Sequence, residues 1–214
     1  MKRCETRWAL FDLDNTMYPK NSGVMEAISR RINAYMVERL GMDKALVRQL
    51  RPKYWKEYGT TLRGLYIESG IDPEDYLSYV HDLSVGEMLA PNAELDRVLG
   101  SLPWRKVILT SASSEHAHRV LTALGVRQHF ERLFGIRDTG YVCKPHPSAY
   151  RTVLDALNVS AEHSIMLDDS IANLRAAGAL GMVTVLVGPD HDVDGADFVI
   201  GRVEEAVDVA CLLA

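Results

Sequence analysis

The sequence has few cysteines and no long apolar run. Its three cysteines, Cys4, Cys143 and Cys211, lie far apart and form no CxxC pair, so neither a disulfide framework nor a zinc knuckle is expected. This cysteine usage fits a reducing compartment, and we expect a cytoplasmic protein. No 18 apolar residues run together, and the apolar run at residues 8–13 is short and interrupted by an aspartate. We therefore expect neither a membrane span nor a signal peptide.

The sequence also lacks an excess of basic residues. Lysine and arginine number 24 against 29 acidic residues, which gives a formal net charge of −5, so a wide basic patch for a nucleic-acid polymer is not expected. No internal repeat or low-complexity tract is visible. With 47% hydrophobic and 25% charged residues, the composition excludes intrinsic disorder, collagen and coiled coil. A chain of 214 residues can bury a full core in one or two domains.

Apolar strands alternate with amphipathic helices along most of the chain. The predicted strands are residues 7–11, 106–110, 133–136, 164–167, 183–187 and 198–200. The predicted helices are residues 93–100, 115–124, 147–157, 171–180 and 203–213. This alternation predicts an α/β fold with a parallel sheet covered by helices on both faces.

A helical block interrupts this pattern after the first strand. Apolar periodicity and capping residues predict four helices and no strand, at about residues 22–40, 43–58, 60–70 and 72–83. Pro52 lies inside the second helix and is expected to kink or split it. We therefore expect a core made of residues 1–16 and 91–214, with residues 17–90 as a helical insertion.

Polar residues gather where the predicted strands end. In an open parallel sheet, ligands bind outside the carboxyl ends of the strands. The residues at or just after these ends are Asp12, Asp14, Thr110, Ser111, Lys144, Asp168 and Asp169. Carboxylates placed this close together repel one another unless a cation joins them. Hard oxygen ligands of this kind suit Mg²⁺, which binds one or two carboxylates together with phosphate and water.

The two aspartates after the first strand could divide the chemistry. Residues two apart on an extended strand point the same way, so one of Asp12 and Asp14 could attack while the other moves protons. A phosphate substrate needs a cation and donors around its oxygens, which Mg²⁺, Lys144 and the Thr110 hydroxyl would supply. A single strand-end aspartate is as often a turn residue or helix cap; the whole set at predicted strand ends favours the functional interpretation.

Four motifs, in order, resemble the signatures of the haloacid dehalogenase-like hydrolase superfamily. They are residues 11–16 (FDLDNT), 108–111 (ILTS), 144–145 (KP) and 167–170 (LDDS) with Asn173. The resemblance covers essentially the whole chain. Further short motifs are similar to those of the pyrimidine 5'-nucleotidase-like branch. They are residues 14–19 (DNTMYP), 22–23 (SG), 56–62 (KEYGTTL), 71–73 (IDP), 80–83 (VHDL) and 144–147 (KPHP).

The resemblance implies a Rossmannoid sheet with a helical cap, residues 17–90, over the active site. It implies that Asp12 is the nucleophile that forms an aspartyl-phosphate. Asp14 would protonate the leaving oxygen and then activate water, while Thr110 and Lys144 would bind the phosphoryl oxygens. One departure is Ser111, where relatives usually carry Asn, but a backbone N–H there can serve the phosphate equally.

The resemblance also implies a Mg²⁺ site and suggests how the substrate is selected. The metal ligands would be the Asp12 carboxylate, the Asp14 backbone carbonyl and the Asp168–Asp169 pair, with Asp169 bound directly and Asp168 acting through water. Ser111 and the polar turn that holds Tyr58, Thr60 and Thr61 are further candidates for substrate binding. The threonines of this turn could instead cap the third predicted helix.

The remaining polar residues are expected to be structural. Cys143 is expected to be a buried, inert thiol rather than a redox site. Surface or supporting positions are expected for all seven histidines: His81, His116, His118, His129, His146, His163 and His191.

These features favour a Mg²⁺-dependent phosphatase that acts on a small phosphomonoester, with a pyrimidine nucleoside 5'-monophosphate as the leading substrate. A phosphatase of sugar or other metabolite phosphates, a phosphomutase and a haloacid dehalogenase remain alternatives. Asp14 and Asp169 argue against the dehalogenase, which needs no second acid. The intact set of acids argues against a non-catalytic binding domain. We expect a monomer or homodimer that binds neither a nucleic-acid polymer nor a membrane.

Overall fold

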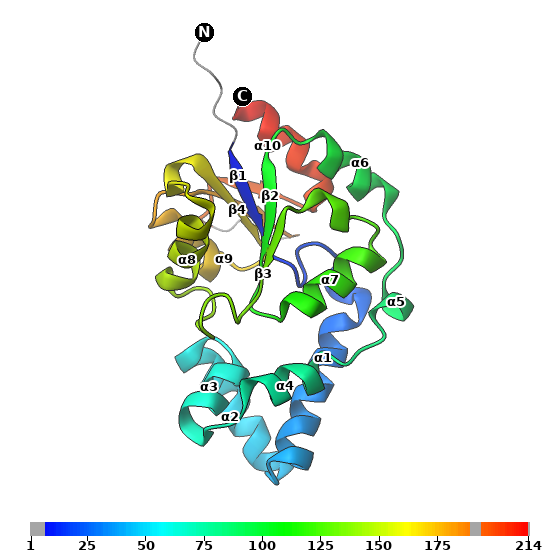
Figure 1. Cartoon of the computed structure of the whole chain (residues 1–214), viewed down its shortest axis with the longest axis vertical. Helices are drawn as coiled ribbons and strands as arrows, with labels where there is room; N and C mark the ends of the chain where they lie inside the picture. The colour runs from blue at the N-terminus through cyan, green and yellow to red at the C-terminus, as the bar shows by residue number, and fades with distance from the viewer. Residues whose placement is uncertain (1–6, 189–193, 214) are drawn as a thin grey trace.

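The protein contains one parallel sheet of six strands in the order β3-β2-β1-β4-β5-β6 (Figure 1). The computed structural model describes residues 7–188 and 194–213, so Cys4 and His191 and the outermost residues of the expected core lie outside the described part. The strands are β1 (Trp8–Phe11), β2 (Arg105–Leu109), β3 (Arg132–Phe134), β4 (Ser164–Asp168), β5 (Val183–Val187) and β6 (Phe198–Ile200). Every neighbouring pair is parallel, which confirms the predicted α/β class.

Both faces of the sheet are buried under helices. Along β1, Ala9 and Phe11 belong to one hydrophobic cluster while Trp8 and Leu10 belong to another, as the alternation of side chains along a strand requires. The first cluster includes side chains of α6 (Ala93–Ser101), α7 (Ser114–Ala123) and α10 (Ala206–Leu212). The second includes side chains of α8 (Pro147–Leu157) and α9 (Ile171–Gly178). The sheet therefore separates two apolar layers, which explains why its strands are mostly apolar.

The strand order reverses at β1, which pairs with β2 on one side and β4 on the other. In such sheets the loops after the central strands diverge and leave a crevice at their carboxyl ends. The end of β4 and the loops that follow β1, β2 and β4 carry the aspartates, the threonine and the serine identified from the sequence. The topology therefore brings residues from distant parts of the chain to one edge of the sheet.

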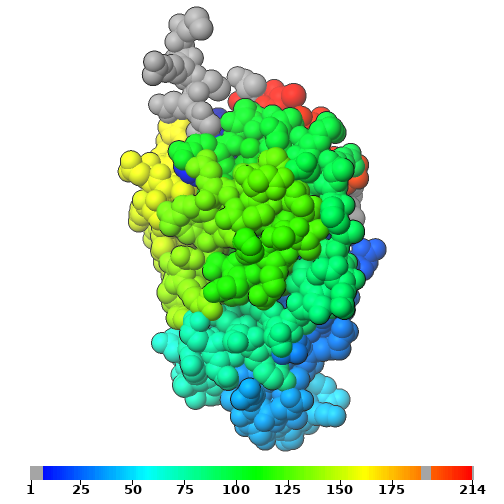
Figure 2. Space-filling model, turned by 45° about the vertical axis from the view of Figure 1, so that its right-hand side comes forward, coloured from blue at the N-terminus to red at the C-terminus, as the bar shows by residue number. Residues whose placement is uncertain are grey.

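The segment between β1 and α6 is helical and lies beyond this carboxyl edge (Figures 1 and 2). It consists of a 3₁₀ turn (Lys20–Ser22), α1 (Val24–Ala34), a π-helical turn (Tyr35–Arg39), α2 (Lys44–Tyr58), α3 (Thr61–Ser69), α4 (Pro73–Val80) and α5 (Val85–Met88). The expected number of four helices is too low, because α5 is a single turn containing Gly86 and has no periodic pattern to reveal it. Gly23, with a φ of +86°, delays the start of α1.

Pro52, which was expected to kink or split α2, does not split it. The helix runs from Lys44 to Tyr58 with Pro52 inside it. Pro52 and Arg48 are both exposed, so water can hydrate the carbonyl that loses its amide partner. Asp43 stabilises the start of the helix by accepting hydrogen bonds from the amides of Ala45 and Leu46, both at 2.8 Å. Within the described ranges, no helix combines the length and apolar character that crossing a bilayer requires.

Candidate active site

Asp12 follows β1 directly and is almost fully buried. Its Oδ1 atom lies 2.7 Å from Nζ of Lys144, and its Oδ2 atom accepts a hydrogen bond from Thr16 Oγ1 at 3.1 Å. The backbone amide of Asp12 donates to the carbonyl of Leu167 on β4 at 2.9 Å. The carboxylate is therefore held from both sides in a fixed orientation at the centre of the sheet edge.

Lys144 is the buried cation of this site. Its Nζ atom lies 2.7 Å from Asp12 Oδ1 and 2.6 Å from Asp168 Oδ2, and its side chain is 2% exposed. Burial alone would lower the pKa of Lys144, but the two carboxylates raise it well above its ordinary value. The lysine is therefore a permanent positive charge beside Asp12. The Lys144–Pro145 bond, whose isomer the sequence left open, is cis.

Three aspartates form an acidic cluster at the end of β1 and β4. Carboxylate oxygens of Asp12, Asp168 and Asp169 all lie within 4.8 Å of one another. Burial raises the pKa of Asp12 to about 7, opposed by Lys144 and reinforced by the charge of Asp168. Burial and the charge of Asp168 also raise the pKa of Asp169. Two lysines, the buried Lys144 and the exposed Lys20, do not balance three clustered carboxylates. Hard oxygen donors with surplus negative charge fit a Mg²⁺ ion.

The two aspartates after β4 differ in how far their oxygens are already used. Asp168 is fully buried and accepts hydrogen bonds from Lys144, from the Ser170 amide at 2.8 Å and from Asn173 Nδ2 at 3.0 Å. Asp169 pairs with Lys20 at 3.3 Å, and the Lys20 side chain is 63% exposed. Asp169 therefore has the freer carboxylate of the two.

Asp14 is bound by two side chains that sequence analysis did not assign to it. Its Oδ1 atom accepts a hydrogen bond from the Tyr18 hydroxyl and lies 3.0 Å from His116 Nε2. Burial raises the pKa of Asp14, but His116 and Tyr18 outweigh it and hold that pKa below its usual value. His116 is fully buried and stacks on His81, with 4.7 Å between ring centroids. Asp14 thus lies in a preformed hydrogen-bond network.

The position of His116 is a supporting one, but neither it nor His81 is on the surface. His81 is 6% exposed, and its Nδ1 atom lies 3.0 Å from Ser113 Oγ. Burial and the neighbouring His116 lower the pKa of His81 to about 3, so His81 is neutral. The available signal for His116 was its place in the first turn of α7, directly after the carboxyl end of β2.

Thr110 and Thr16 complete the polar edge. Thr110 is buried after β2, and its Oγ1 atom accepts a hydrogen bond from the Ala112 amide at 3.0 Å, so the hydroxyl hydrogen is available to another oxygen. Thr16 donates to Asp12 and accepts from the Asp169 amide at 3.1 Å. Thr16 therefore ties the loop after β1 to the loop after β4, a role that its place in the FDLDNT motif could have suggested.

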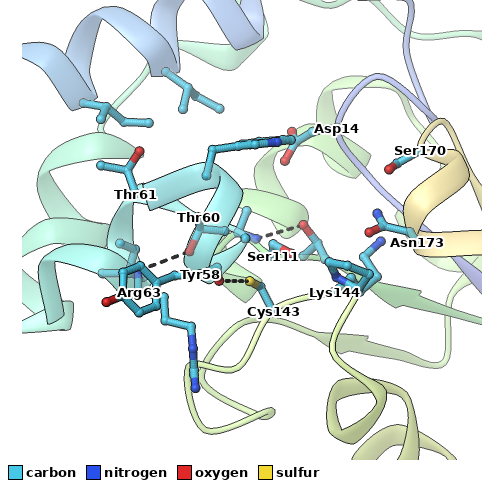
Figure 3. A pocket seen from close by; sticks show the side chains of 18 of the residues that line it. Asp14, Tyr58, Thr60, Thr61, Arg63, Ser111, Cys143, Lys144, Ser170 and Asn173 are labelled. Atoms are coloured by element: carbon cyan, nitrogen blue, oxygen red, sulfur yellow. Dashed lines mark hydrogen bonds between the residues drawn. The ribbon is translucent and has the colours of Figure 1, made fainter. Parts of the chain in front are cut away.

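A cavity of about 1090 Å³ lies between the helical segment and the carboxyl edge of the sheet. Seen from close by in Figure 3, Asp14, Ser111 and Lys144 surround it together with side chains of the helical segment. The predicted site residues that line it are Asp12, Asp14, Tyr58, Thr60, Thr61, Thr110, Ser111, Lys144 and Asp169. Asp168 lies behind Lys144 and does not contribute to the lining.

The turn between α2 and α3 contacts the loop that carries Lys144. Thr60 Oγ1 accepts a hydrogen bond from the Arg63 amide at 3.2 Å, so this threonine does cap α3. The Cys143 thiol donates to the Tyr58 carbonyl at 3.3 Å (Figure 3). Gly59 has a φ of +82°, and a Cβ atom there would lie 2.7 Å from Cys143 Sγ. Glycine is therefore required for this close approach.

The side chains of this turn, and Cys143 in the loop that it contacts, differ in burial and in hydrogen bonding. The Tyr58 hydroxyl donates to Glu68 Oε1 at 3.0 Å, and Thr61 is 7% exposed. Cys143 is 3% exposed, and burial raises the pKa of its thiol, which fits an unreactive cysteine.

Comparison with known proteins gives one family. A family model described as a haloacid dehalogenase-like hydrolase matches residues 6–181. The chain is 27% identical over 191 residues to phosphate metabolism protein 8 of Saccharomyces cerevisiae, covering 82% of this chain and 60% of that protein. It is 29% identical over 229 residues to glyceraldehyde 3-phosphate phosphatase of Methanopyrus kandleri, covering 96% of this chain and 97% of that protein.

Solved structures share the same fold. A HAD phosphatase from Thermococcus onnurineus aligns with a TM-score of 0.64 at 18% identity, over 95% of this chain and 97% of that one. L-2-haloacid dehalogenase from Xanthobacter autotrophicus, with chloropropionic acid covalently bound, aligns with a TM-score of 0.64 at 16% identity, over 98% of this chain and all of that one. Phosphatases and dehalogenases thus share this architecture. The fold therefore does not identify the reaction, which has to be inferred from the residues of the site.

Proposed function

The chain belongs to the haloacid dehalogenase-like hydrolases, and from this premise we propose that it is a Mg²⁺-dependent phosphatase of small phosphomonoesters. The observation that carries the proposal is the cavity shared by Asp12 and Asp14: one aspartate beside a buried lysine, and a second bound to His116 and Tyr18. A dehalogenase needs the first acid but no second one. Phosphate transfer to water needs both.

The reaction begins at Asp12. Asp14, which is ionised in the empty protein because its pKa is lowered, takes up a proton when the anionic phosphate ester binds beside it. An Asp12 carboxylate oxygen then attacks phosphorus, the bond from phosphorus to the leaving oxygen breaks, and Asp14 gives that oxygen its proton. Asp14 then takes a proton from water, whose oxygen attacks phosphorus, and inorganic phosphate leaves as the Asp12 carboxylate re-forms. Lys144 and the Thr110 hydroxyl stabilise the phosphoryl oxygens in both steps. Hydrogen bonds from Tyr18 and His116 keep Asp14 oriented for proton transfer.

The same residues would hold Mg²⁺. The Asp12 carboxylate, the Asp14 backbone carbonyl and Asp169 would bind the ion, and Asp168 would act through water, because its own oxygens already accept bonds from Lys144 and Asn173. When bound, the ion neutralises charge on the transferring phosphoryl group. The donor chemistry of the acidic cluster and the raised pKa of Asp12 support this assignment.

The helical segment, residues 17–90, is proposed as the cap, with residues 1–16 and 91–214 as the catalytic core. The contact between the α2–α3 turn and the Lys144 loop supports this division, because it joins the helical segment to the loop that carries the proposed phosphate-binding lysine. Tyr58, Thr60, Thr61 and Ser111 line the cavity and are proposed to contact the substrate. Cap contacts of this kind determine the leaving group while the core determines the chemistry.

A pyrimidine nucleoside 5'-monophosphate is the substrate we propose first. The short motifs that resemble the pyrimidine 5'-nucleotidase-like branch support it. The cavity of about 1090 Å³ also supports it, because it is large for a two- or three-carbon phosphate. The names of glyceraldehyde 3-phosphate phosphatase and phosphoglycolate phosphatase among the relatives favour a small metabolite phosphate as the second candidate. A cytoplasmic location is proposed because the cysteines in the described part, Cys143 and Cys211, are free.

A panel of phosphate esters tests the proposal. Phosphate release is measured with Mg²⁺ from nucleoside monophosphates, sugar phosphates, glyceraldehyde 3-phosphate and 2-phosphoglycolate, with Asp12→Asn as the inactive control. Release from at least one ester, lost in the variant and in excess chelator, is the expected result. Chloride release from a 2-chloro acid without phosphate release from any ester would assign the protein to the dehalogenases instead.

A further inference from the structure

The roof of the cavity is an apolar surface that contains the partly buried Arg51; a second arginine that lines the cavity, Arg63, donates to the Tyr141 carbonyl at 2.8 Å. Helices α1, α2 and α4 form this roof over the catalytic aspartates. The apolar side chains that line it include Met25, Ile28, Ile32, Tyr76, Leu77 and Val80. Arg51 comes from the middle of α2 and lines the same cavity.

Arg51 is fixed against α1 on one side of its guanidinium. Its Nη1 atom donates to Ser29 Oγ and to Asn33 Oδ1, both at 2.9 Å, and contacts the Ser29 carbonyl at 3.3 Å. Among the described residues neither Nε nor Nη2 has a hydrogen-bond partner; Nε is buried, whereas Nη2 is not. The described part of the chain also offers Arg51 no carboxylate at ion-pair distance. A positive charge is thus held in place with part of its hydrogen-bonding capacity unused.

Burial lowers the pKa of Arg51, although the guanidinium stays protonated. Its Nη2 group is therefore a charged donor, unused by the described residues, on an apolar cavity wall. An oxygen acceptor on a bound molecule would form a charge-assisted hydrogen bond with it. Because the arginine lies in the roof and the phosphate site in the floor, the acceptor must be on the leaving group.

We propose that Arg51 binds an oxygen atom of the leaving group, at the end remote from the scissile phosphate. This inference rests on the proposed phosphatase function and names the substrate feature that the cap selects. Two kinds of leaving group carry such an oxygen: a pyrimidine base, through a ring carbonyl, and an acid, through its carboxylate. Uracil and cytosine both have a ring carbonyl oxygen, whereas adenine has none. The arginine therefore favours pyrimidine over adenine nucleotides, and acidic over neutral phosphate esters.

Steady-state kinetics of Arg51→Met tests the proposal. The substrates are uridine 5'-monophosphate, adenosine 5'-monophosphate, 2-phosphoglycolate and phenyl phosphate, which has no remote oxygen. The ratio of kcat/KM for the uridine or glycolate ester to that for phenyl phosphate falls by about 10- to 100-fold, the loss expected for a hydrogen bond to a charged group. The ratio for the adenosine ester changes far less. The ester whose ratio falls most identifies the acceptor as a ring carbonyl or a carboxylate.

Arg48→Met is the matched control, because Arg48 lies on the same helix, is exposed and bonds only the Lys44 carbonyl among the described residues. It leaves all four ratios unchanged. If Arg51→Met does not fold, Arg51→Gln, which can still bond Ser29, replaces it with the same expectation. An equal loss on every ester would assign Arg51 to cap folding and overturn the proposal, as would unchanged ratios.

Binding of uridine and glycolate separates the inference from the proposed function. Calorimetry measures their affinity without turnover, and Arg51→Met weakens the one that binds. If the wild-type protein hydrolyses no ester but binds uridine or glycolate through Arg51, the phosphatase proposal fails while the proposed role of Arg51 in binding is retained. If esters are hydrolysed but neither the kcat/KM ratios nor the affinities depend on Arg51, the proposed role of Arg51 is wrong while the phosphatase proposal is retained.

Discussion

The Asp12 carboxyl links Mg²⁺ binding to pH in the range from 6 to 8. Its pKa is raised from an ordinary 3.8 to about 7, chiefly by burial and by the charge of Asp168. In the metal-free protein Asp12 is therefore protonated below pH 7. A metal ligand must be deprotonated, so Mg²⁺ competes with this proton. Mg²⁺ affinity consequently rises as the pH rises through 7.

The size of the effect follows from that pKa. At pH 6 about one-tenth of Asp12 is ionised and at pH 8 about nine-tenths, so the affinity for Mg²⁺ rises by about tenfold between them. Asp169, whose pKa is also raised, can make this dependence steeper. The same raised pKa makes the stability of the metal-free protein depend on pH. The folded protein binds the Asp12 proton more tightly than the unfolded chain does, so the contribution of Asp12 to the free energy of unfolding falls as the pH rises from about 4 to 7. Mg²⁺ therefore raises Tm more at pH 8 than at pH 6.

Isothermal titration calorimetry at pH 6 and pH 8 measures both affinities, and repeating it in two buffers gives the number of protons released. Each Mg²⁺ ion that binds displaces about nine-tenths of a proton at pH 6 and only about one-tenth of a proton at pH 8. Asp12→Asn serves as the control, because it removes the titrating group and flattens the dependence. Equal affinities at both pH values, or an unchanged dependence in the variant, would refute the assignment of Asp12 as a metal ligand with a raised pKa.

Three further outcomes are expected. Lys144→Met lowers kcat by about 10²- to 10³-fold and, because it leaves Asp12 facing a second carboxylate, destabilises the metal-free protein by about 3 kcal/mol in urea unfolding; normal turnover with only a lower Tm would make Lys144 structural. His116→Ala lowers kcat by about tenfold at nearly constant KM by freeing Asp14, and His116→Gln, which keeps a donor, restores part of it; equal losses in both variants would exclude the hydrogen bond as the cause. Thr60→Ala removes the cap of α3 and costs about 1 kcal/mol in thermal unfolding; an unchanged Tm would show that the cap hydrogen bond contributes nothing.

The sheet could be predicted from the sequence because each strand is mostly apolar. Strand β5 was expected at its observed bounds, and β1 and β2 within one residue of theirs. These runs differ from their surroundings in composition, which is a local property. The order of the strands is not a local property, and it could not be predicted from composition and periodicity without the family resemblance.

The parts that sequence could not predict depend on contacts between distant residues. The hydrogen bond between Asp14 and His116 joins residues 102 positions apart, and nothing in the pattern around either one indicates the other. Arg51 could not be identified as a ligand-binding candidate, because which of its donors stay unused becomes evident only once α1 and α2 are packed. The π-helical turn after α1 has the same apolar spacing as an α-helix, so the sequence could not distinguish them.

The central claim is that Asp12 is phosphorylated during turnover. Acid quenching of the protein with Mg²⁺ and its best ester, followed by mass spectrometry of the peptide containing residues 8–20, tests this most directly. A phosphoryl group on Asp12 that accumulates within one turnover, and is absent from Asp12→Asn together with the activity, is the result we predict. Steady hydrolysis with no phosphoryl group on Asp12, and an Asp12→Asn variant that retains activity within about threefold of the wild type, would contradict the covalent mechanism.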